Sequence, residues 1–382
     1  MSLEEIQFGG MLTMALLTLT LAFLLPVRTA MGNIFSRARW LMAGATSLLF
    51  IQFLLQYTLH FRQMGVTQGV FINLLFFVPC AWQLSLGLLY LQRNGKVLRH
   101  EWLGGIGAYV IMVVLLITVG TIKGHSLLED TPEMRMAEYM AACIYSIIQL
   151  YYSWLNAHGF RHLRRALDNY YDHDKSDMLR WMERSVLLLS LSALFVPPTL
   201  FATGPLLLAY SVFIFLSMYY CIFSFICYGV SSAPQQVMEA ETEQEDEEEE
   251  KEEKQEEKVK TEKTANPEEL GHTKEAVDRW IAAKRHMRNG ITIQTAANEM
   301  HVSRHQLTVW LKTTEQELFN PWLTHLRIEE AKLMLKDHHE WSNDHIAEAC
   351  GFSSRSYFHT VFRKQTGLTP SQYAEQASRG SV

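Results

Sequence analysis

The side chains best suited to recognition chemistry lie near the C-terminus, between Gly351 and Gly367. Phe358, Val361 and Phe362 recur at helical spacing and are expected to form the buried face of a short helix. The opposite face is polar and basic and holds Arg355, Ser356, His359, Thr360, Arg363 and Lys364. Such side chains can form hydrogen bonds with the edges of nucleic-acid bases and with phosphate oxygens.

Two short helices around a tight turn are expected to position this face. An apolar stripe in the first helix ends at Cys350, and Gly351 follows, where a sharp turn needs a residue that tolerates positive φ. Ser353 or Ser354 can accept a backbone N–H and begin the second helix, and Gly367 ends it. This pattern is typical of a helix-turn-helix that reads the major groove of DNA.

The run GFSSRSYFHTVFRKQTGLTPSQY, from Gly351 to Tyr373, resembles the second half of the AraC-type DNA-binding domain, a bacterial transcription-factor module. The resemblance covers about residues 272–376 and rests on many spaced positions. It implies base contacts by His305, Thr308, Val309, Arg355, Ser356, His359 and Thr360. Residues better placed for phosphate contacts are Ser303, Arg304, Lys312, Ser354, Arg363 and Lys364.

An internal repeat predicts a second reading unit upstream of the first. Apolar and capping positions recur at offsets of 50 and 51, so that Ala297 corresponds to Ala347 and Ser303 to Ser354. We expect an amphipathic helix over residues 274–288, a helix over 292–300, a turn at His301 and a second helix capped by Ser303. A helix over residues 322–336, with Leu326, Ala331, Leu333 and Leu335 as core residues, is expected to join the two units.

Two such units on a rigid linking helix can enter successive major grooves, which lie ~34 Å apart along DNA. The upstream unit has His301 where the downstream unit has Gly351, and the Val309 side chain cannot form a hydrogen bond with a base. We therefore expect the downstream unit to discriminate more strongly between sequences. A helix-turn-helix that serves only protein contacts is the alternative.

The first 231 residues hold seven apolar stretches, each near the ~20 residues with which a helix crosses a bilayer. They run roughly over 8–26, 40–60, 69–91, 103–122, 136–158, 185–203 and 205–229. These stretches predict a multi-pass helical bundle in lipid. The odd-numbered loops carry twelve Lys or Arg and the even-numbered loops three. The positive-inside rule then places the N-terminus outside the bacterial inner membrane and the C-terminus in the cytoplasm.

Polar side chains inside these stretches are candidates for sensing an unknown small-molecule or protein signal. Gln52, Gln56 and His60 are spaced to share one face of the second stretch. The alternative is that such amides only bond between helices, at ~1 kcal/mol or less. The five cysteines lack metal-ligand spacing and no catalytic motif is found, so we expect neither an enzyme nor a bound metal or cofactor.

A strongly acidic segment separates the two halves of the chain. Residues 239–263 hold 14 acidic side chains and 5 lysines, a net charge of −9, and have too little apolar surface to fold as a domain. We expect a membrane domain over residues 1–231, a solvated tether over 232–271, a tandem helix-turn-helix domain over 272–376 and a tail over 377–382. Alternatively, the acidic segment occupies the DNA-binding face as a phosphate mimic.

The sequence therefore predicts an all-α chain that acts as a membrane-tethered, sequence-specific transcription regulator. Its expected partners are double-stranded DNA, the lipid bilayer, an unknown signal and a second copy of the chain, because pairing in the membrane raises the effective concentration at paired sites. One alternative is a membrane transporter or small-molecule-handling protein with an appended regulatory domain. Another is an interaction scaffold that does not bind DNA.

Overall fold

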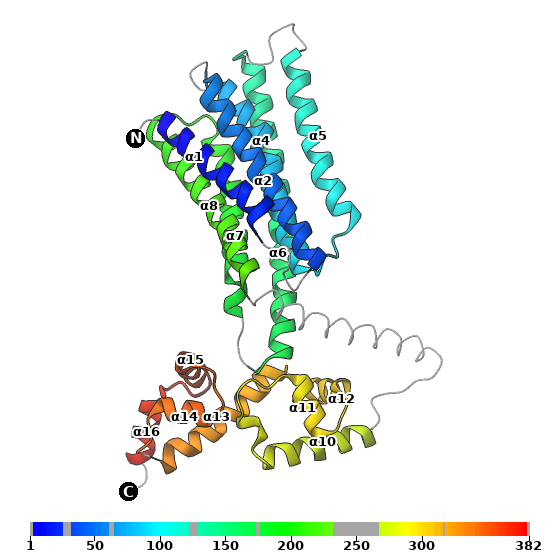
Figure 1. The fold of residues 1–382 in the computed structure, drawn as a ribbon, viewed down its shortest axis with the longest axis vertical. Helices are drawn as coiled ribbons and strands as arrows, with labels where there is room; N and C mark the ends of the chain where they lie inside the picture. The colour runs from blue at the N-terminus through cyan, green and yellow to red at the C-terminus, as the bar shows by residue number, and fades with distance from the viewer. Residues whose placement is uncertain are drawn as a thin grey trace, which may run out of the picture. The chain divides into compact units, whose positions relative to one another are not determined.

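A computed structural model describes residues 3–25, 32–60, 65–121, 129–172, 176–231, 267–315, 318–338 and 340–379. All regular elements in these residues are helical, as predicted, and the one β-bridge is isolated. The chain forms two compact units (Figure 1). The first comprises residues Met1–Leu163 and Met178–Met238, and the second comprises Arg164–Asp177 and Glu239–Val382. The acidic segment over 239–263 lies outside the described residues.

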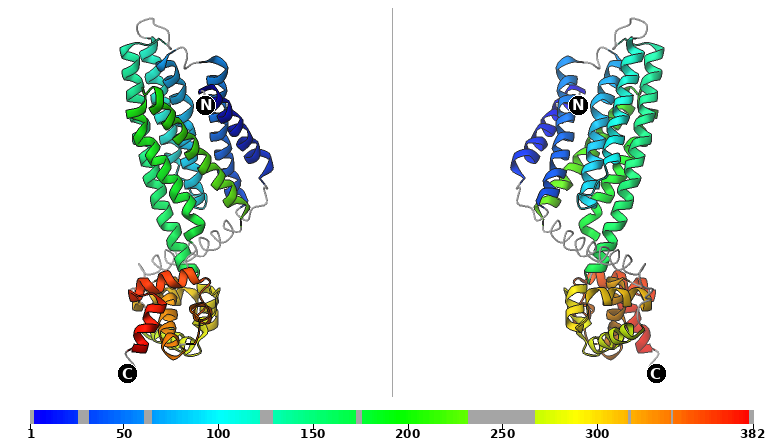
Figure 2. Two further views of the ribbon diagram at one scale, coloured as in Figure 1. Left: turned by 90° about the vertical axis from the view of Figure 1, so that its left-hand side faces the viewer. Right: turned by 90° about the vertical axis from the view of Figure 1, so that its right-hand side faces the viewer.

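Every apolar stretch predicted in the first half falls on a helix, and these helices pack lengthwise in a bundle (Figures 1 and 2). The helices are α1 (Leu3–Leu19, continued by a π-helical turn over Thr20–Leu24), α2 (Gly32–Leu59), α4 (Val66–Gln92), α5 (Arg99–Thr121), α6 (Pro132–Tyr170), α7 (Arg180–Thr199) and α8 (Gly204–Val230). Helix α6 continues past Leu163, so its last residues belong to the second unit.

Five helices in the described residues are long and apolar enough to cross a membrane, whereas the sequence analysis predicts seven spans. The five segments are Gln7–Leu24, Asn33–Leu59, Val66–Gln92, Arg99–Thr121 and Gly204–Val230. Helix α6 is long enough but not apolar enough to be counted, because polar residues such as Glu138 and Gln149 interrupt its apolar stretch. Helix α7 is not among the five because three of its first five residues, Arg180, Glu183 and Arg184, are charged.

The second unit begins with α10 (Pro267–Ala282) and a 3-10 turn (Arg285–Met287), where a single helix over 274–288 is predicted. Lys284 ends the regular helix because its backbone is left-handed, with φ 51°. The helices that follow are α11 (Ile293–Met300), α12 (Arg304–Trp310, continued by a π-helical turn over Leu311–Glu315), α13 (Phe319–Asp337), α14 (Asn343–Ala349), α15 (Arg355–Thr366) and α16 (Pro370–Arg379).

Helix α13 belongs to two hydrophobic cores. Its N-terminal half contributes Phe319 and Leu323 to a core shared with α10, α11 and α12. Its C-terminal half contributes Ile328 and Leu335 to a core shared with α14 and α15. The linking helix predicted from the repeat is thus present. Leu333 was predicted to lie in the core but is 55% exposed, because its position on α13 falls between the buried stripes.

Candidate nucleic-acid interface and a polar cavity

The downstream helix-turn-helix is formed by α14, a turn at Gly351 and α15. Ser342 caps α14 by accepting from the His345 N–H at 3.2 Å. Ser354, one of the two predicted candidates, caps α15 by accepting from the Tyr357 N–H at 3.2 Å. Gly367 ends α15 with φ 78°. The local signals in the sequence therefore set both ends of the reading helix.

The predicted DNA-contacting side chains of α15 share one face of the helix. Phe358 and Phe362 are fully buried on the other face, which attaches α15 to the core. His359 is half-buried, and the exposed residues are Ser354, Arg355, Ser356, Thr360, Arg363 and Lys364. The structure brings together all seven residues predicted for this unit. Their roles toward DNA stay predictions.

Arg355 is held in a fixed direction by a carboxylate that the sequence analysis did not identify. The Arg355 Nε lies 3.0 Å from the Asp344 Oδ1, and the Arg355 Nη1 donates to the Asp344 Oδ2 at 3.2 Å. Both side chains are more than half exposed, so the pair is screened by solvent and contributes little to stability. The two contacts orient the Arg355 guanidinium relative to α14. The pair joins α14 to α15, and helical periodicity within one element gives no sign of it.

The upstream unit repeats this construction with α11 and α12. His301 has φ 57° and takes the place of the turn glycine, as predicted. Ser303 caps α12 and forms a capping box with Gln306. A left-handed backbone without glycine is found here, and histidine is among the residues that tolerate it.

Exposure on α12 differs from the prediction at one position. Ser303 and Lys312 are exposed, and Arg304, His305 and Val309 are half-buried. Thr308 is 1% exposed, whereas the sequence analysis places it on the exposed face. Thr308 directly follows the buried Leu307 and precedes the buried Leu311 by three residues, so it lies at the edge of the buried stripe. In this conformation Thr308 cannot reach a base.

Replacing Ser354 with alanine is expected to destabilise the downstream unit by about 1 kcal/mol, because the Tyr357 N–H loses its acceptor. Ser353→Ala is the matched control, since Ser353 is exposed, adjacent and does not cap α15. Hydrogen exchange in α15, measured in the full-length protein in detergent, gives the difference in stability between the two variants. Equal losses in the two variants would show that the cap is not needed.

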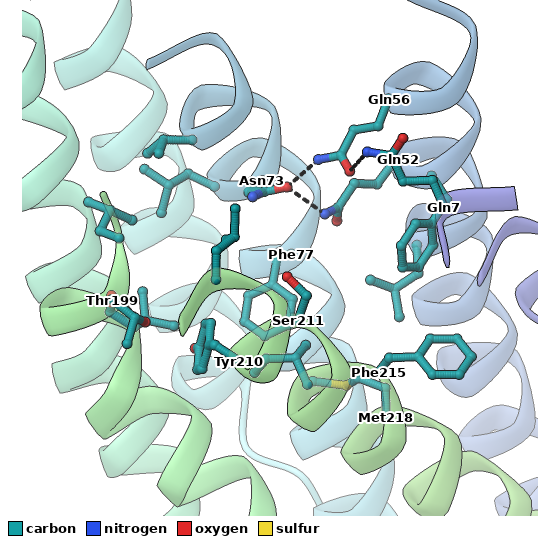
Figure 3. A pocket seen from close by; sticks show the side chains of 18 of the residues that line it. Gln7, Gln52, Gln56, Asn73, Phe77, Thr199, Tyr210, Ser211, Phe215 and Met218 are labelled. Atoms are coloured by element: carbon teal, nitrogen blue, oxygen red, sulfur yellow. Dashed lines mark hydrogen bonds between the residues drawn. The ribbon is translucent and has the colours of Figure 1, made fainter. Parts of the chain in front are cut away.

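A cluster of amide side chains lies inside the first unit, between α1, α2 and α4 (Figure 3). The Asn73 Oδ1 accepts from the Gln52 Nε2 at 2.8 Å and from the Gln56 Nε2 at 2.5 Å. The Gln7 Nε2 donates to the Gln56 Oε1 at 3.4 Å. These bonds fix the amide orientations and leave the Gln52 Oε1 buried without a partner.

The amide cluster forms one wall of a cavity of about 140 Å³. The other walls are mostly apolar side chains from α1, α2, α4 and α8 and from the end of α7, with Tyr210 and Ser211 as further polar groups (Figure 3). Gln52 and Gln56 line the cavity, and their role in sensing stays a prediction. His60 follows the end of α2, is exposed and has φ 50°, so it does not continue the face of Gln52 and Gln56.

Within the described ranges, no group of three or more His, Cys, Asp or Glu side chains is placed to hold a metal ion. Cys80, Cys221 and Cys350 are buried and all five cysteines are free thiols. Burial raises the pKa of the Cys350 thiol to about 12. This cysteine therefore packs as a small apolar residue.

Comparison with known proteins bears on the second unit. Residues 296–376 match a family described as a helix-turn-helix domain. The regulatory protein PocR of Salmonella typhimurium is 30% identical over 122 residues, which cover 32% of this chain and 39% of PocR. The HTH-type transcriptional regulator GadX of Escherichia coli O157:H7 is 35% identical over 89 residues, 23% of this chain and 32% of GadX.

The HTH-type transcriptional regulator YijO of Escherichia coli K12 is 34% identical over 88 residues, 23% of this chain and 31% of YijO. This chain thus spans roughly a third of the length of these relatives. No solved structure matches. Taken with the tandem arrangement of α11–α12 and α14–α15, the match shows that residues 296–376 form a helix-turn-helix domain of the AraC type.

Proposed function

We propose that this chain is a membrane-tethered transcription regulator whose second unit binds specific DNA sequences. The observation that carries the proposal is the polar and basic face of α15, exposed on a helix whose other face is fixed in the core. The similarity to regulators such as PocR and GadX supports it. In α15 we assign base reading to Arg355, Ser356, His359 and Thr360, and phosphate contacts to Ser354, Arg363 and Lys364.

The assignments for α12 are His305 and Val309 for bases and Ser303, Arg304 and Lys312 for phosphates. Thr308 joins the base-reading set only if DNA binding exposes it. The downstream unit thus offers more accessible reading groups than the upstream unit. This asymmetry supports the expectation that α15 discriminates more strongly between sequences.

The exposed surface of the first unit supports its insertion in a bilayer. Only 28% of the candidate span in α1 and 22% of those in α5 and α8 are buried within the chain. Large apolar side chains cover these exposed faces. Soluble proteins rarely expose apolar surfaces of this extent. Helix α6 also exposes apolar residues from Met136 to Trp154, a length of about 27 Å at 1.5 Å per residue. We therefore include α6 and α7 among the helices that contact lipid.

We propose the orientation given by the loop charges, with the N-terminus outside the bacterial inner membrane and the second unit in the cytoplasm. Either five or seven crossings would put the two termini on opposite sides of the membrane, and the excess of basic residues in the odd-numbered loops of the seven-span arrangement selects the cytoplasm for the C-terminus. The acidic segment over 239–263 would serve as a solvated connection between the units. This placement gives the reading helices access to the chromosome.

We further propose that the first unit senses a small uncharged molecule in the cavity beside Gln52. An apolar cavity of about 150 Å³ can bind benzene, and the cavity here has a similar volume of about 140 Å³. The free lone pairs of the buried Gln52 Oε1 call for a hydrogen-bond donor on the ligand. A phenol-sized molecule with one hydroxyl satisfies both conditions.

The test of DNA reading compares one arginine and one lysine of α15, Arg355 and Lys364. DNA binding is measured with the full-length protein in lipid nanodiscs. Arg355→Ala is expected to weaken binding to a selected duplex by about 1–3 kcal/mol and to relax sequence preference. Lys364→Ala is expected to weaken binding to all duplexes alike and to lower the salt slope by about 1. Gln365→Ala, an exposed neighbour outside the predicted contacts, serves as the control. Absence of any salt-dependent duplex binding by the unmodified protein would refute the proposal.

The cavity is tested with phenol and toluene, which are similar in shape. Phenol has a hydroxyl group that can donate a hydrogen bond, and toluene has a methyl group in its place. The full-length protein in detergent is expected to bind phenol more tightly by about 1 kcal/mol, or about fivefold. Gln52→Leu removes the acceptor and should abolish that preference. His60→Ala should retain it, because His60 does not line the cavity. Equal affinity of the unmodified protein for the two probes would rule out a donor-specific site.

A further inference from the structure

The DNA-binding unit contains a buried arginine at the junction of its two cores. Arg327 is 1% exposed and lies on α13 between Leu323 of the first core and Ile328 of the second. Its Nε donates to the His286 carbonyl at 2.9 Å, and its Nη2 donates to the Arg288 carbonyl. Burial lowers the pKa of the Arg327 guanidinium, and the negative charge of Asp172 opposes that shift. A buried guanidinium needs such a counter-charge.

Asp172, which supplies the counter-charge, lies 155 residues before Arg327 in the sequence. The Arg327 Nη2 donates to the Asp172 Oδ2 at 3.0 Å, and the Arg327 Nη1 donates to the Asp172 carbonyl at 3.2 Å. Asp172 is itself 1% exposed. Asp172 falls within the membrane domain predicted over residues 1–231, whereas in the structure Arg164–Asp177 belong to the second compact unit.

Asp172 also holds the backbone that leads into the upstream reading unit. Its Oδ2 accepts from the Gly290 N–H at 2.8 Å and from the Ile291 N–H at 3.0 Å. The preceding residue, Tyr171, forms an isolated antiparallel bridge with Thr292, the N-cap of α11. One carboxylate therefore fixes both α13 and the start of α11.

The segment that Asp172 fixes also contacts the downstream reading unit. A Cβ atom on Gly351 would lie 2.4 Å from the Met287 carbonyl oxygen, so the turn between α14 and α15 packs directly on this backbone. The Arg327 guanidinium lies 5.9 Å from the ring centre of Phe352, the next residue of that turn. A shift of Asp172 would therefore move groups that support both reading helices.

We propose that Asp172 is a positioning residue through which the end of α6 controls the geometry of the two reading helices. Helix α6 runs from Pro132 in the first unit to Tyr170 in the second, so Asp172 follows it by two residues. A rotation or shift of α6 reaches Arg327 and the segment before α11 without passing through the acidic connection over 239–263. This inference rests on the proposed DNA binding and adds the route by which binding is regulated.

Coupling between two sites is reciprocal, so the proposal can be tested without knowing which signal the first unit senses. If α6 influences DNA affinity, DNA binding must influence the end of α6 by the same coupling free energy. Hydrogen exchange of residues 160–172 is measured in the full-length protein in nanodiscs, with and without a bound duplex. We expect slower exchange in the DNA complex. Binding of DNA with unchanged exchange there would overturn the inference, whereas failure to bind DNA would refute the proposed function instead.

Two variants separate positioning from structural support. Asp172→Asn keeps the shape and the acceptor oxygen but loses the charge, and it should lower DNA affinity by about tenfold, a typical coupling factor. Asp177→Asn, an exposed carboxylate in the same segment, is the control.

Four glycines inserted between Leu163 and Arg164 leave Asp172 in place but interrupt α6. The protein with the insertion should still bind DNA. DNA binding should no longer slow hydrogen exchange in residues 160–163, which precede the insertion. A change that persisted before the insertion would show that the coupling does not pass along α6 to Asp172, and would overturn the inference.

Discussion

Replacing Arg327 with leucine should destabilise the DNA-binding unit by about 3–5 kcal/mol, the usual cost of removing one partner of a buried ion pair. The variant leaves the Asp172 carboxylate buried with two backbone N–H donors and no counter-charge. It also leaves the His286 and Arg288 carbonyls without the guanidinium. Since domains are stable by only about 5–15 kcal/mol, this loss should open the unit measurably.

Hydrogen exchange in α11 and α13 of the full-length protein in detergent measures this loss. Glu329→Gln is the control, because it breaks the exposed Glu329–Lys332 pair on the same helix and should cost less than about 1 kcal/mol. Combining Arg327→Leu with Asp172→Asn removes both charges and should be less harmful than Arg327→Leu alone. An Arg327→Leu variant as stable as the Glu329→Gln variant would show that the pair is not needed.

Replacing Gly351 with alanine is the second large effect that we expect. Gly351 has φ 80°, which costs an L-residue about 1–2 kcal/mol. A Cβ would in addition lie 2.4 Å from the Met287 carbonyl oxygen, so backbone must move in the segment that supports both reading units. Overpacking of this kind adds about 1–3 kcal/mol. The variant should therefore lose both stability and DNA affinity.

Gly367→Ala is the matched control for this prediction. Gly367 has nearly the same backbone angle, φ 78°, but nothing lies within 4 Å of a Cβ placed there. Its replacement should show the conformational cost alone. The difference between the two variants, measured by thermal unfolding of the full-length protein, isolates the contact with Met287. Equal melting temperatures would mean that the close approach at Gly351 carries no energetic weight.

Local signals in the sequence predict much of the second unit. The caps at Ser303 and Ser354, the left-handed turns at His301 and Gly351 and the repeat of two helix pairs all depend on neighbouring residues, and all are found. These features are visible in sequence because capping and positive φ depend on residue type at one position. The helical character of the seven apolar stretches follows in the same way from their composition.

Contacts between distant residues could not be predicted from the sequence. The pairing of Asp172 with Arg327 joins an α6-proximal segment to α13, and periodicity within either segment carries no sign of the other. The same limit applies to the buried Thr308 and the exposed Leu333, whose burial depends on how neighbouring helices pack. His60 has the helical spacing of Gln52 and Gln56, but α2 ends one residue before it. Spacing predicts a shared face only while the helix continues.

In our proposal, the paired reading units bind DNA while the chain is held in a bilayer. The most direct measurement is to cross-link the intact protein to DNA in bacteria that produce it, isolate the membranes and sequence the attached fragments. We expect one enriched sequence with two half-sites about 10 base pairs apart, and its loss in the Arg355→Ala variant. Membranes that contain the protein but no enriched sequence, or DNA recovered only with soluble protein, would contradict the claim.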